Sequence, residues 1–142
     1  MSLQPVLKRL LADMDADVRE YRALNALLEE QFATALRHDS AGLEVLARTI
    51  TAAVDGLEKR RQARVVLVSR LLPTHARPSM AAVLERLSVP ARKAVAARWS
   101  TLESLVRECK ERNAGNGRLM SDQQALLQRV LTGKEEDTYA AA

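Results

Sequence analysis

The sequence has few of the residues that build aromatic cores and disulfide frameworks. Only 3% of its 142 residues are aromatic, so aromatic packing cannot dominate the core. The single cysteine, Cys109, excludes an internal disulfide and a Cys/His zinc site within one chain. No apolar run approaches the length of a membrane span, and no signal peptide is visible at the N-terminus. We therefore expect a cytoplasmic protein without stable membrane insertion.

Patterns of residues that carry catalysis or bind cofactors are also missing. The two histidines, His38 and His75, fall in predicted loops and are not paired at metal-ligand spacing. The run Gly115-Asn116-Gly117 lacks the lysine and the preceding strand of a phosphate-binding loop. Cys109 lies on an apolar helical stripe, where a small buried side chain is the ordinary interpretation. The sequence therefore predicts no enzyme, no metal site and no bound cofactor.

Leucine, alanine, arginine and glutamate dominate instead, a composition typical of long helices and coiled coils. Two apolar stripes with steps of three and four residues predict helices over residues 3–36 and 40–72. Asp39 or Ser40 can cap the second helix, which Pro73 ends. Because the break between them is short, the two helices are predicted to pack antiparallel. The stripes comprise Leu3, Leu7, Leu10, Met14, Val18, Tyr21, Leu24, Leu28 and Phe32, then Leu43, Leu46, Ile50, Val54, Leu57, Gln62 or Arg61, Val65, Val68 and Leu72.

The remainder of the chain predicts one short helix and one further long helix. After a connector of residues 73–78, Ser79 is expected to cap the short helix and Ser88 the long one, which covers residues 91–131. The predicted fold class is all-α: an elongated antiparallel helical bundle or coiled coil of three long helices and one short connecting helix. Residues 1–131 form a single domain, and residues 132–142, with little apolar content, form a flexible tail.

The last helix carries an unbroken seam of three- and four-residue steps, which is typical of a coiled coil. Its ends are apolar, but amides occupy its middle. The neighbouring Gly115 and Gly117 each weaken a helix by up to about 1 kcal/mol relative to alanine. Such a seam indicates either a fixed register or a helix whose partner is missing from this chain. The seam comprises Trp99, Leu102, Val106, Cys109, Asn113, Asn116, Met120, Gln123, Leu127 and Val130.

Positive charge is concentrated in the middle of the chain. Residues 40–98 hold eleven Lys or Arg against four Asp or Glu, although the net charge of the whole chain is only +4. An anionic partner such as nucleic acid is one interpretation, and the solvated face of a long helix is the other. No aromatic residues are interleaved to stack on bases, which disfavours nucleic acid. The positive charge is densest at Lys59, Arg60, Arg61 and Arg64.

Several segments follow the pattern of one known family. They are Tyr21-Arg22-Ala23-Leu24-Asn25-Ala26-Leu27-Leu28-Glu29, then Ala35-Leu36 with Asp39, then Leu43, Leu46 and Leu57 with Arg61, and Thr138-Tyr139. The most specific is Cys109-Lys110-Glu111-Arg112-Asn113-Ala114-Gly115-Asn116-Gly117-Arg118-Leu119, which contains an Asn…Asn-Gly motif. Over nearly its whole length the chain resembles the FlgN-type flagellar export chaperones.

The resemblance implies a cytoplasmic, non-enzymatic chaperone of flagellar type III secretion. Such chaperones bind the C-terminal helical segments of the hook–filament junction proteins FlgK and FlgL, prevent premature assembly and deliver these clients to the export apparatus. Binding by the C-terminal part is implied, which here means residues 113–131. We expect this part to be mobile when free and ordered by the client. The expected client-binding residues are Asn113, Asn116, Gly117, Leu119, Met120, Leu126, Leu127, Val130 and Leu131.

Two other functions fit a helical chain of this kind. In the first, the protein is a structural coiled coil that self-associates, and its last helix pairs with a second copy of itself. In the second, which is less favoured, it is a basic helical protein that associates with nucleic acid through its central cations. A homo-oligomer is therefore possible in addition to the client complex.

Overall fold

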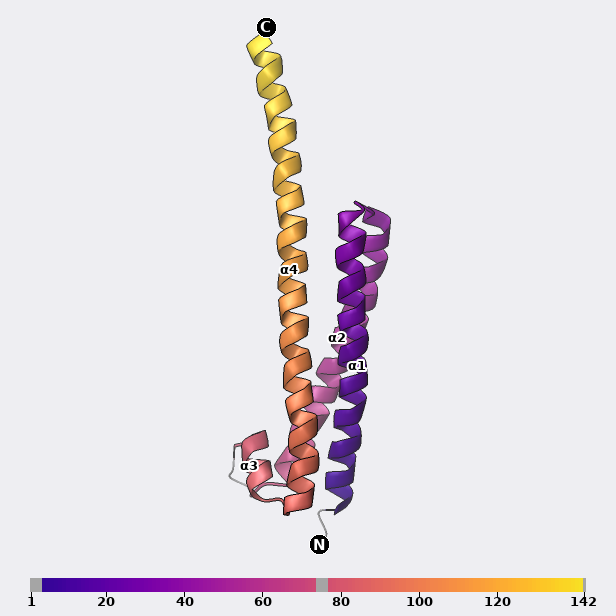
Figure 1. Ribbon diagram of the computed structural model, residues 1–142, viewed down its shortest axis with the longest axis vertical. Coiled ribbons are helices and arrows are strands. Elements are labelled where there is room, and N and C mark those ends of the chain that lie inside the picture. Colours follow the sequence, from indigo (N-terminus) through magenta and orange to yellow (C-terminus); the bar gives the residue numbers. More distant parts are fainter. Residues whose placement is uncertain (1–3, 74–76, 142) are drawn as a thin grey trace.

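The computed structural model describes the backbone of residues 4–73 and 77–141, and the side chains of residues 4–73 and 77–132. The predictions for Leu3 and His75 lie outside the described residues. Within those residues the protein is all-α, and the prediction of three long helices and one short helix is confirmed. No described helix is both long and apolar enough to cross a membrane. In chain order the helices are α1 (Gln4–Leu36), α2 (Ser40–Arg70), α3 (Met80–Glu85) and α4 (Val89–Ala141) (Figure 1).

A tight reversal between α1 and α2 makes these two helices antiparallel. His38 adopts a left-handed conformation with φ of 55°, a place that glycine usually takes. The backbone N–H of His38 donates to the carbonyl of Ala35 at 3.0 Å, and that of Asp39 donates to Thr34 at 3.2 Å. As predicted, Asp39 caps α2: its carboxylate accepts from the backbone N–H of Gly42 at 2.9 Å. Local hydrogen bonds therefore determine this turn.

Helix α1 is the centre of the bundle and packs against both α2 and α4, whereas α2 and α4 pack little against each other. Because α3 returns the chain at the lower end, α4 runs parallel to α1 (Figure 1). Ser79 caps α3 as predicted, since its hydroxyl accepts from Ala82 N–H at 3.1 Å. The main core lies at this lower end and comprises Leu7, Leu10, Met14, Val68, Leu71, Leu72, Met80, Val83, Val95 and Leu102.

The core narrows toward the upper end of the bundle. A second, smaller cluster contains only Leu24, Leu28, Leu57 and Cys109. Three residues of the predicted apolar stripes, Phe32, Val54 and Val65, are exposed. Their expected place in the core is wrong. Val54 and Val65 lie on α2, which packs little against α4. Phe32 lies near the end of α1, beyond the last α1 residue of either core cluster.

Helix α4 is longer than the sequence predicted. The predicted end was residue 131, but the helical backbone continues to Ala141. Most of the proposed tail, residues 132–142, therefore belongs to α4. The side chain of Tyr139 lies outside the described residues, and the flexibility of the tail stays a prediction.

Candidate functional site

Three side chains of α4 reach backbone carbonyls of α1, and each pair is separated by 88 residues in the sequence. The constant separation means that the two helices run parallel in a heptad register. At the same offset, Val95 and Leu102 fall opposite Leu7 and Met14 in the main core. The interface is therefore apolar at its lower end and polar above. The three pairs are Cys109 Sγ and Tyr21 O at 3.8 Å, Asn116 Nδ2 and Leu28 O at 2.8 Å, and Gln123 Nε2 and Ala35 O at 3.0 Å.

The predicted seam of α4 divides into two rows with a spacing of seven residues. The row that faces α1, called the inner row, comprises Leu102, Cys109, Asn116 and Gln123, and Val130 continues this row beyond the end of α1. The second, called the outer row, begins with two residues that share a pocket with Arg64 of α2 and ends with Leu127, which is 58% exposed. The outer row comprises Trp99, Val106, Asn113, Met120 and Leu127.

The two asparagines of the seam occupy different environments. Asn116 is buried and also donates from Nδ2 to Oε1 of Gln31 at 2.9 Å. Asn113 is exposed and its side chain has no hydrogen-bond partner. Gly117 is exposed, and a Cβ placed on it would meet nothing within 4 Å. Of these three predicted site residues, only Asn116 therefore holds α4 to its neighbour.

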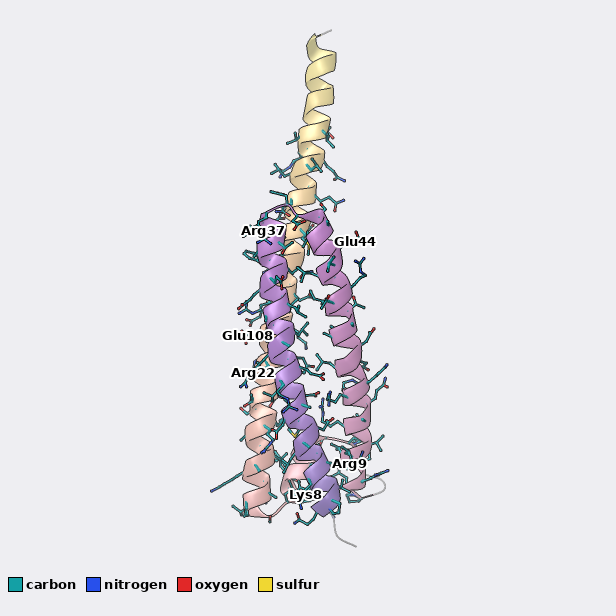
Figure 2. All side chains as sticks on the ribbon, turned by 90° about the vertical axis from the view of Figure 1, so that its right-hand side faces the viewer. Lys8, Arg9, Arg22, Arg37, Glu44 and Glu108 are labelled. Carbon is teal, nitrogen blue, oxygen red and sulfur yellow. The ribbon has the colours of Figure 1, made fainter. Side chains whose placement is uncertain are left out.

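The upper part of α4 projects beyond the α1–α2 hairpin. The 88-residue offset places Leu36, the last residue of α1, opposite Gln124. Residues 125–141, called the overhang, extend past the hairpin turn (Figure 1). Figure 2 shows this projection above Arg37 and Glu44, which stand at the turn. Among the predicted binding residues, Leu119 and Met120 are half-buried, whereas four on the overhang are 45–58% exposed: Leu126, Leu127, Val130 and Leu131.

An open pocket of about 410 Å³ lies where the overhang meets the hairpin turn. It is called the corner pocket. The turn contributes His38, and α4 contributes the remaining lining, which is mostly apolar. Its α4 residues are Gln123, Gln124, Leu126, Leu127 and Val130.

The sequence did not predict that residues of the α1–α2 hairpin are exposed beside the overhang and line the corner pocket. Phe32 and Leu36 are exposed near the end of α1, and His38 lines the corner pocket. Their exposure depends on the register between α1 and α4, which no local pattern reveals. The one feature that indicates a projecting end is the difference in helix length, since α4 has 53 residues and α1 only 33.

The central cations are largely used within the bundle. Arg64 donates to Asp17, and also to Asp13 at 3.3 Å. The Nε of Arg60 lies 3.0 Å from Oδ1 of Asp17, but its N–H does not point at this oxygen, so the contact is electrostatic. Arg60 also pairs with Glu20, and Arg61 pairs with Glu58 on its own helix. Within the cluster only Lys59 lacks a carboxylate partner, which leaves little free charge for nucleic acid.

Burial raises the pKa of three ionisable groups: Asp17, Tyr21 and Cys109. Burial raises the pKa of Asp17 above its usual value, and the hydrogen bond from Arg64 opposes this effect. Burial also raises the pKa of the Cys109 thiol, which therefore stays protonated at neutral pH. A protonated, buried thiol is a poor nucleophile, so Cys109 acts in packing.

The fold is a helical bundle whose last helix carries large apolar side chains past the end of its own core, an arrangement typical of proteins that bind other proteins. The chain belongs to the FlgN family, since the family model described as FlgN protein matches residues 1–133. This is a family of flagellar export chaperones. No curated protein and no solved structure gives a significant match.

Proposed function

We propose that this chain is a cytoplasmic flagellar export chaperone that holds the C-terminal helical segments of FlgK and FlgL and delivers them to the export apparatus. The observation that carries the proposal is the overhang, whose four large apolar side chains are 45–58% exposed. A client helix that lies on the overhang and in the corner pocket removes these side chains from water. The family membership supports the kind of client, and the geometry supports the place.

The apolar surface of the overhang is broad enough to receive a helix. Leu126, Leu127, Val130 and Leu131 cover about 140° of the helix circumference at 100° per residue. Full burial of such a side chain contributes about 1.5–3 kcal/mol, so covering its exposed half contributes about 1 kcal/mol. Four such contacts give a gross gain of about 4 kcal/mol, which suits a client that must later be released.

The polar inner row also suits a helix that exchanges partners. A hydrogen bond within a protein contributes only about 1 kcal/mol net, so Asn116 and Gln123 hold the upper part of α4 weakly. We propose that this part moves relative to α1 when the client binds. The conformational entropy that is lost when the client orders this part of α4 then lowers the affinity of the complex and favours release.

The test is a titration of the full chain with C-terminal peptides of FlgK and FlgL. The double variant Leu126→Gln/Leu131→Gln removes apolar surface from the overhang and keeps good helix formers. We expect it to weaken binding at least tenfold. The matched control Val45→Gln/Val66→Gln changes two equally exposed residues of α2 and should alter affinity less than twofold. Undiminished binding by the overhang variant would refute the proposed site.

Self-association through the overhang is the second candidate, and the same exposed side chains support it. Sedimentation of the free chain at micromolar concentration separates the two functions. A monomer that binds the peptides supports the chaperone. A dimer that the overhang variant abolishes, without any peptide binding, supports the structural coiled coil.

A further inference from the structure

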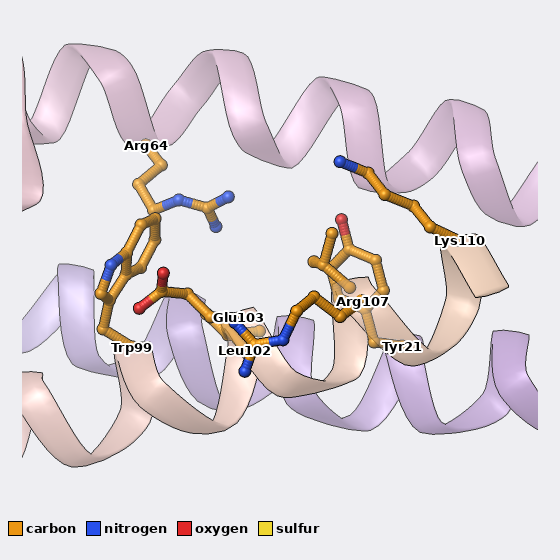
Figure 3. A pocket seen from close by; sticks show the side chains of 8 residues that line it. Tyr21, Arg64, Trp99, Leu102, Glu103, Arg107 and Lys110 are labelled. Carbon is orange, nitrogen blue, oxygen red and sulfur yellow. The ribbon is translucent and has the colours of Figure 1, made fainter.

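A second unoccupied surface lies in the middle of the bundle, below the overhang. Here α2 and α4 diverge, and α1 forms the floor between them. The resulting open groove has a volume of about 290 Å³ (Figure 3). It is called the central groove. Tyr21 contributes the floor, Arg64 extends from α2, and α4 supplies the opposite wall, which includes Trp99, Leu102, Glu103, Val106, Arg107 and Lys110.

The central groove has the shape of a missing helix. Its α4 wall follows one face of that helix from Trp99 to Lys110, which is about 16 Å at 1.5 Å per residue. The apolar lining of the groove comes from α1 and α4, and α2 contributes Arg64. A helix of about three turns matches this length, whereas the volume is small for a drug-sized ligand.

The rim of the groove carries positive charge that the bundle does not neutralise. Arg107 and Lys110 are exposed and have neither an ion pair nor a side-chain hydrogen bond. Arg64 differs from them, because its charge is matched by Asp13 and Asp17. One carboxylate, Glu103, also lines the groove and likewise has no ion pair. The unpaired rim groups therefore favour a partner with more carboxylates than cations along its flank.

We infer that the central groove is a docking site for an amphipathic helix of a partner protein. The apolar face of this helix packs on Tyr21, Trp99 and Val106, and its flanking carboxylates face Arg107 and Lys110. The bundle then has four long helices along this stretch. This surface is separate from the overhang, so the inference does not depend on the identity of the client.

The single tryptophan of the chain makes the inference testable in the intact protein. Trp99 lines the groove and is the only tryptophan, so its fluorescence reports occupancy directly. The probe is an 18-residue peptide with leucines at heptad spacing, flanking glutamates and no aromatic residue. Its analogue carries lysine at every glutamate position. We expect the glutamate peptide to cause a saturable blue shift of Trp99 emission, and the lysine peptide to bind at least tenfold more weakly.

Charge reversal in the protein supplies the matched comparison. The variant Arg107→Glu/Lys110→Glu should lose at least tenfold in affinity for the glutamate peptide and should gain affinity for the lysine peptide. The control Arg19→Glu/Lys59→Glu makes the same change in net charge at exposed positions outside the groove and should change affinity less than twofold. Because all four side chains are exposed, circular dichroism should show unchanged folding.

Three results would overturn the inference. They are an absent Trp99 response, equal affinity for the two peptides, and an equal effect of the rim and control variants. A blue shift that grows with protein concentration, together with a dimer in sedimentation, would show that a second copy fills the groove instead. The Leu126→Gln/Leu131→Gln variant should still bind the glutamate peptide, which separates this site from the proposed client site.

Discussion

The side-chain amide of Asn116 donates from Nδ2 to the backbone carbonyl oxygen of Leu28, 2.8 Å away on a parallel helix. The same nitrogen donates to Oε1 of Gln31 at 2.9 Å, so both of its hydrogens are used. Asn116 is only 3% exposed. A buried amide with specific partners fixes one register between two helices, because any slip leaves it unpaired.

This hydrogen-bonded contact predicts that the same substitution affects stability very differently at the two asparagines of the seam. Asn116→Asp removes the donor and places a carboxylate against a carbonyl, and we expect a loss of about 2 kcal/mol in the free energy of unfolding at pH 7. The loss should shrink toward pH 4, where the carboxyl takes up a proton and can donate again. Asn113→Asp, at an exposed position, should change stability by less than about 0.5 kcal/mol. Urea unfolding at both pH values measures the difference, and equal effects would contradict the observed register.

Replacement of a second buried amide side chain, that of Asn25, is predicted to stabilise the fold. Asn25 is buried, and neither its Nδ2 nor its Oδ1 has a hydrogen-bond partner. An unpaired buried polar group costs about 1–3 kcal/mol, so Asn25→Leu should raise the free energy of unfolding by about 1 kcal/mol or more. Asn113→Leu serves as the control and should give no comparable gain. Destabilisation by Asn25→Leu in thermal unfolding would contradict the prediction.

The carboxylate of Asp17 predicts a dependence of stability on pH. Arg64→Met leaves this carboxylate, 1% exposed, with only the electrostatic contact from Arg60. Breaking a buried ion pair costs about 3–5 kcal/mol, which we expect at pH 7. Burial already raises the pKa of Asp17, and loss of the Arg64 hydrogen bond raises it further. A raised pKa in the folded state means that stability falls as pH rises, so the deficit should shrink toward pH 4.

The matched control for this variant is Arg61→Met. Arg61 pairs with Glu58 at the surface, where an ion pair contributes about 0–1 kcal/mol. Chemical unfolding from pH 4 to pH 7 compares the two substitutions with the wild type. A deficit of Arg64→Met that stayed constant over this range would show that Asp17 does not respond to its neighbour.

Two glycines of α2 predict opposite effects of the same substitution. A Cβ on Gly42 would lie 2.5 Å from Oδ2 of Asp39 and 3.0 Å from Cγ2 of Thr34, so Gly42→Ala disturbs the cap. We expect a loss of about 1–2 kcal/mol, as for loss of an N-cap. A Cβ on Gly56 would meet nothing within 4 Å, so Gly56→Ala should stabilise the helix by up to about 1 kcal/mol. Melting temperatures should shift in opposite directions, and a shift of the same sign would be inconsistent with this geometry.

Local signals predicted much of this fold. Asp39 and Ser79 cap the helices at the predicted residues, and the predicted stripes locate the two long helices of the hairpin. These features depend on neighbouring residues, which a sequence displays directly. The end of the last helix was wrong by ten residues. Gly133 and the low apolar content of residues 132–141 favoured a stop near residue 131, but the helical backbone continues through this glycine to Ala141.

Features that depend on the register between helices far apart in the sequence were not predictable in the same way. Steps of three and four place Asn113 and Asn116 on one seam, but a single neighbouring helix covers only one of them. Whether α2 approaches the other row depends on how α2 and α4 diverge, and Val54 and Val65 remain exposed as a result. The binding role of residues 113–131 rests on the resemblance and the exposed overhang, and stays a prediction.

The 88-residue separation between the paired residues of α1 and α4 has a kinetic consequence. Helices α1 and α2 can meet as soon as a turn of three residues forms, because closing a short loop costs little chain entropy. Docking of α4 on α1 must close a loop more than ten times longer, and such non-local contacts form late. Its upper half is also held by few apolar contacts, which makes it a low-stability unit in local opening. The half of α4 that is proposed to carry the client is therefore expected to be the last part to join the fold and the first to leave it.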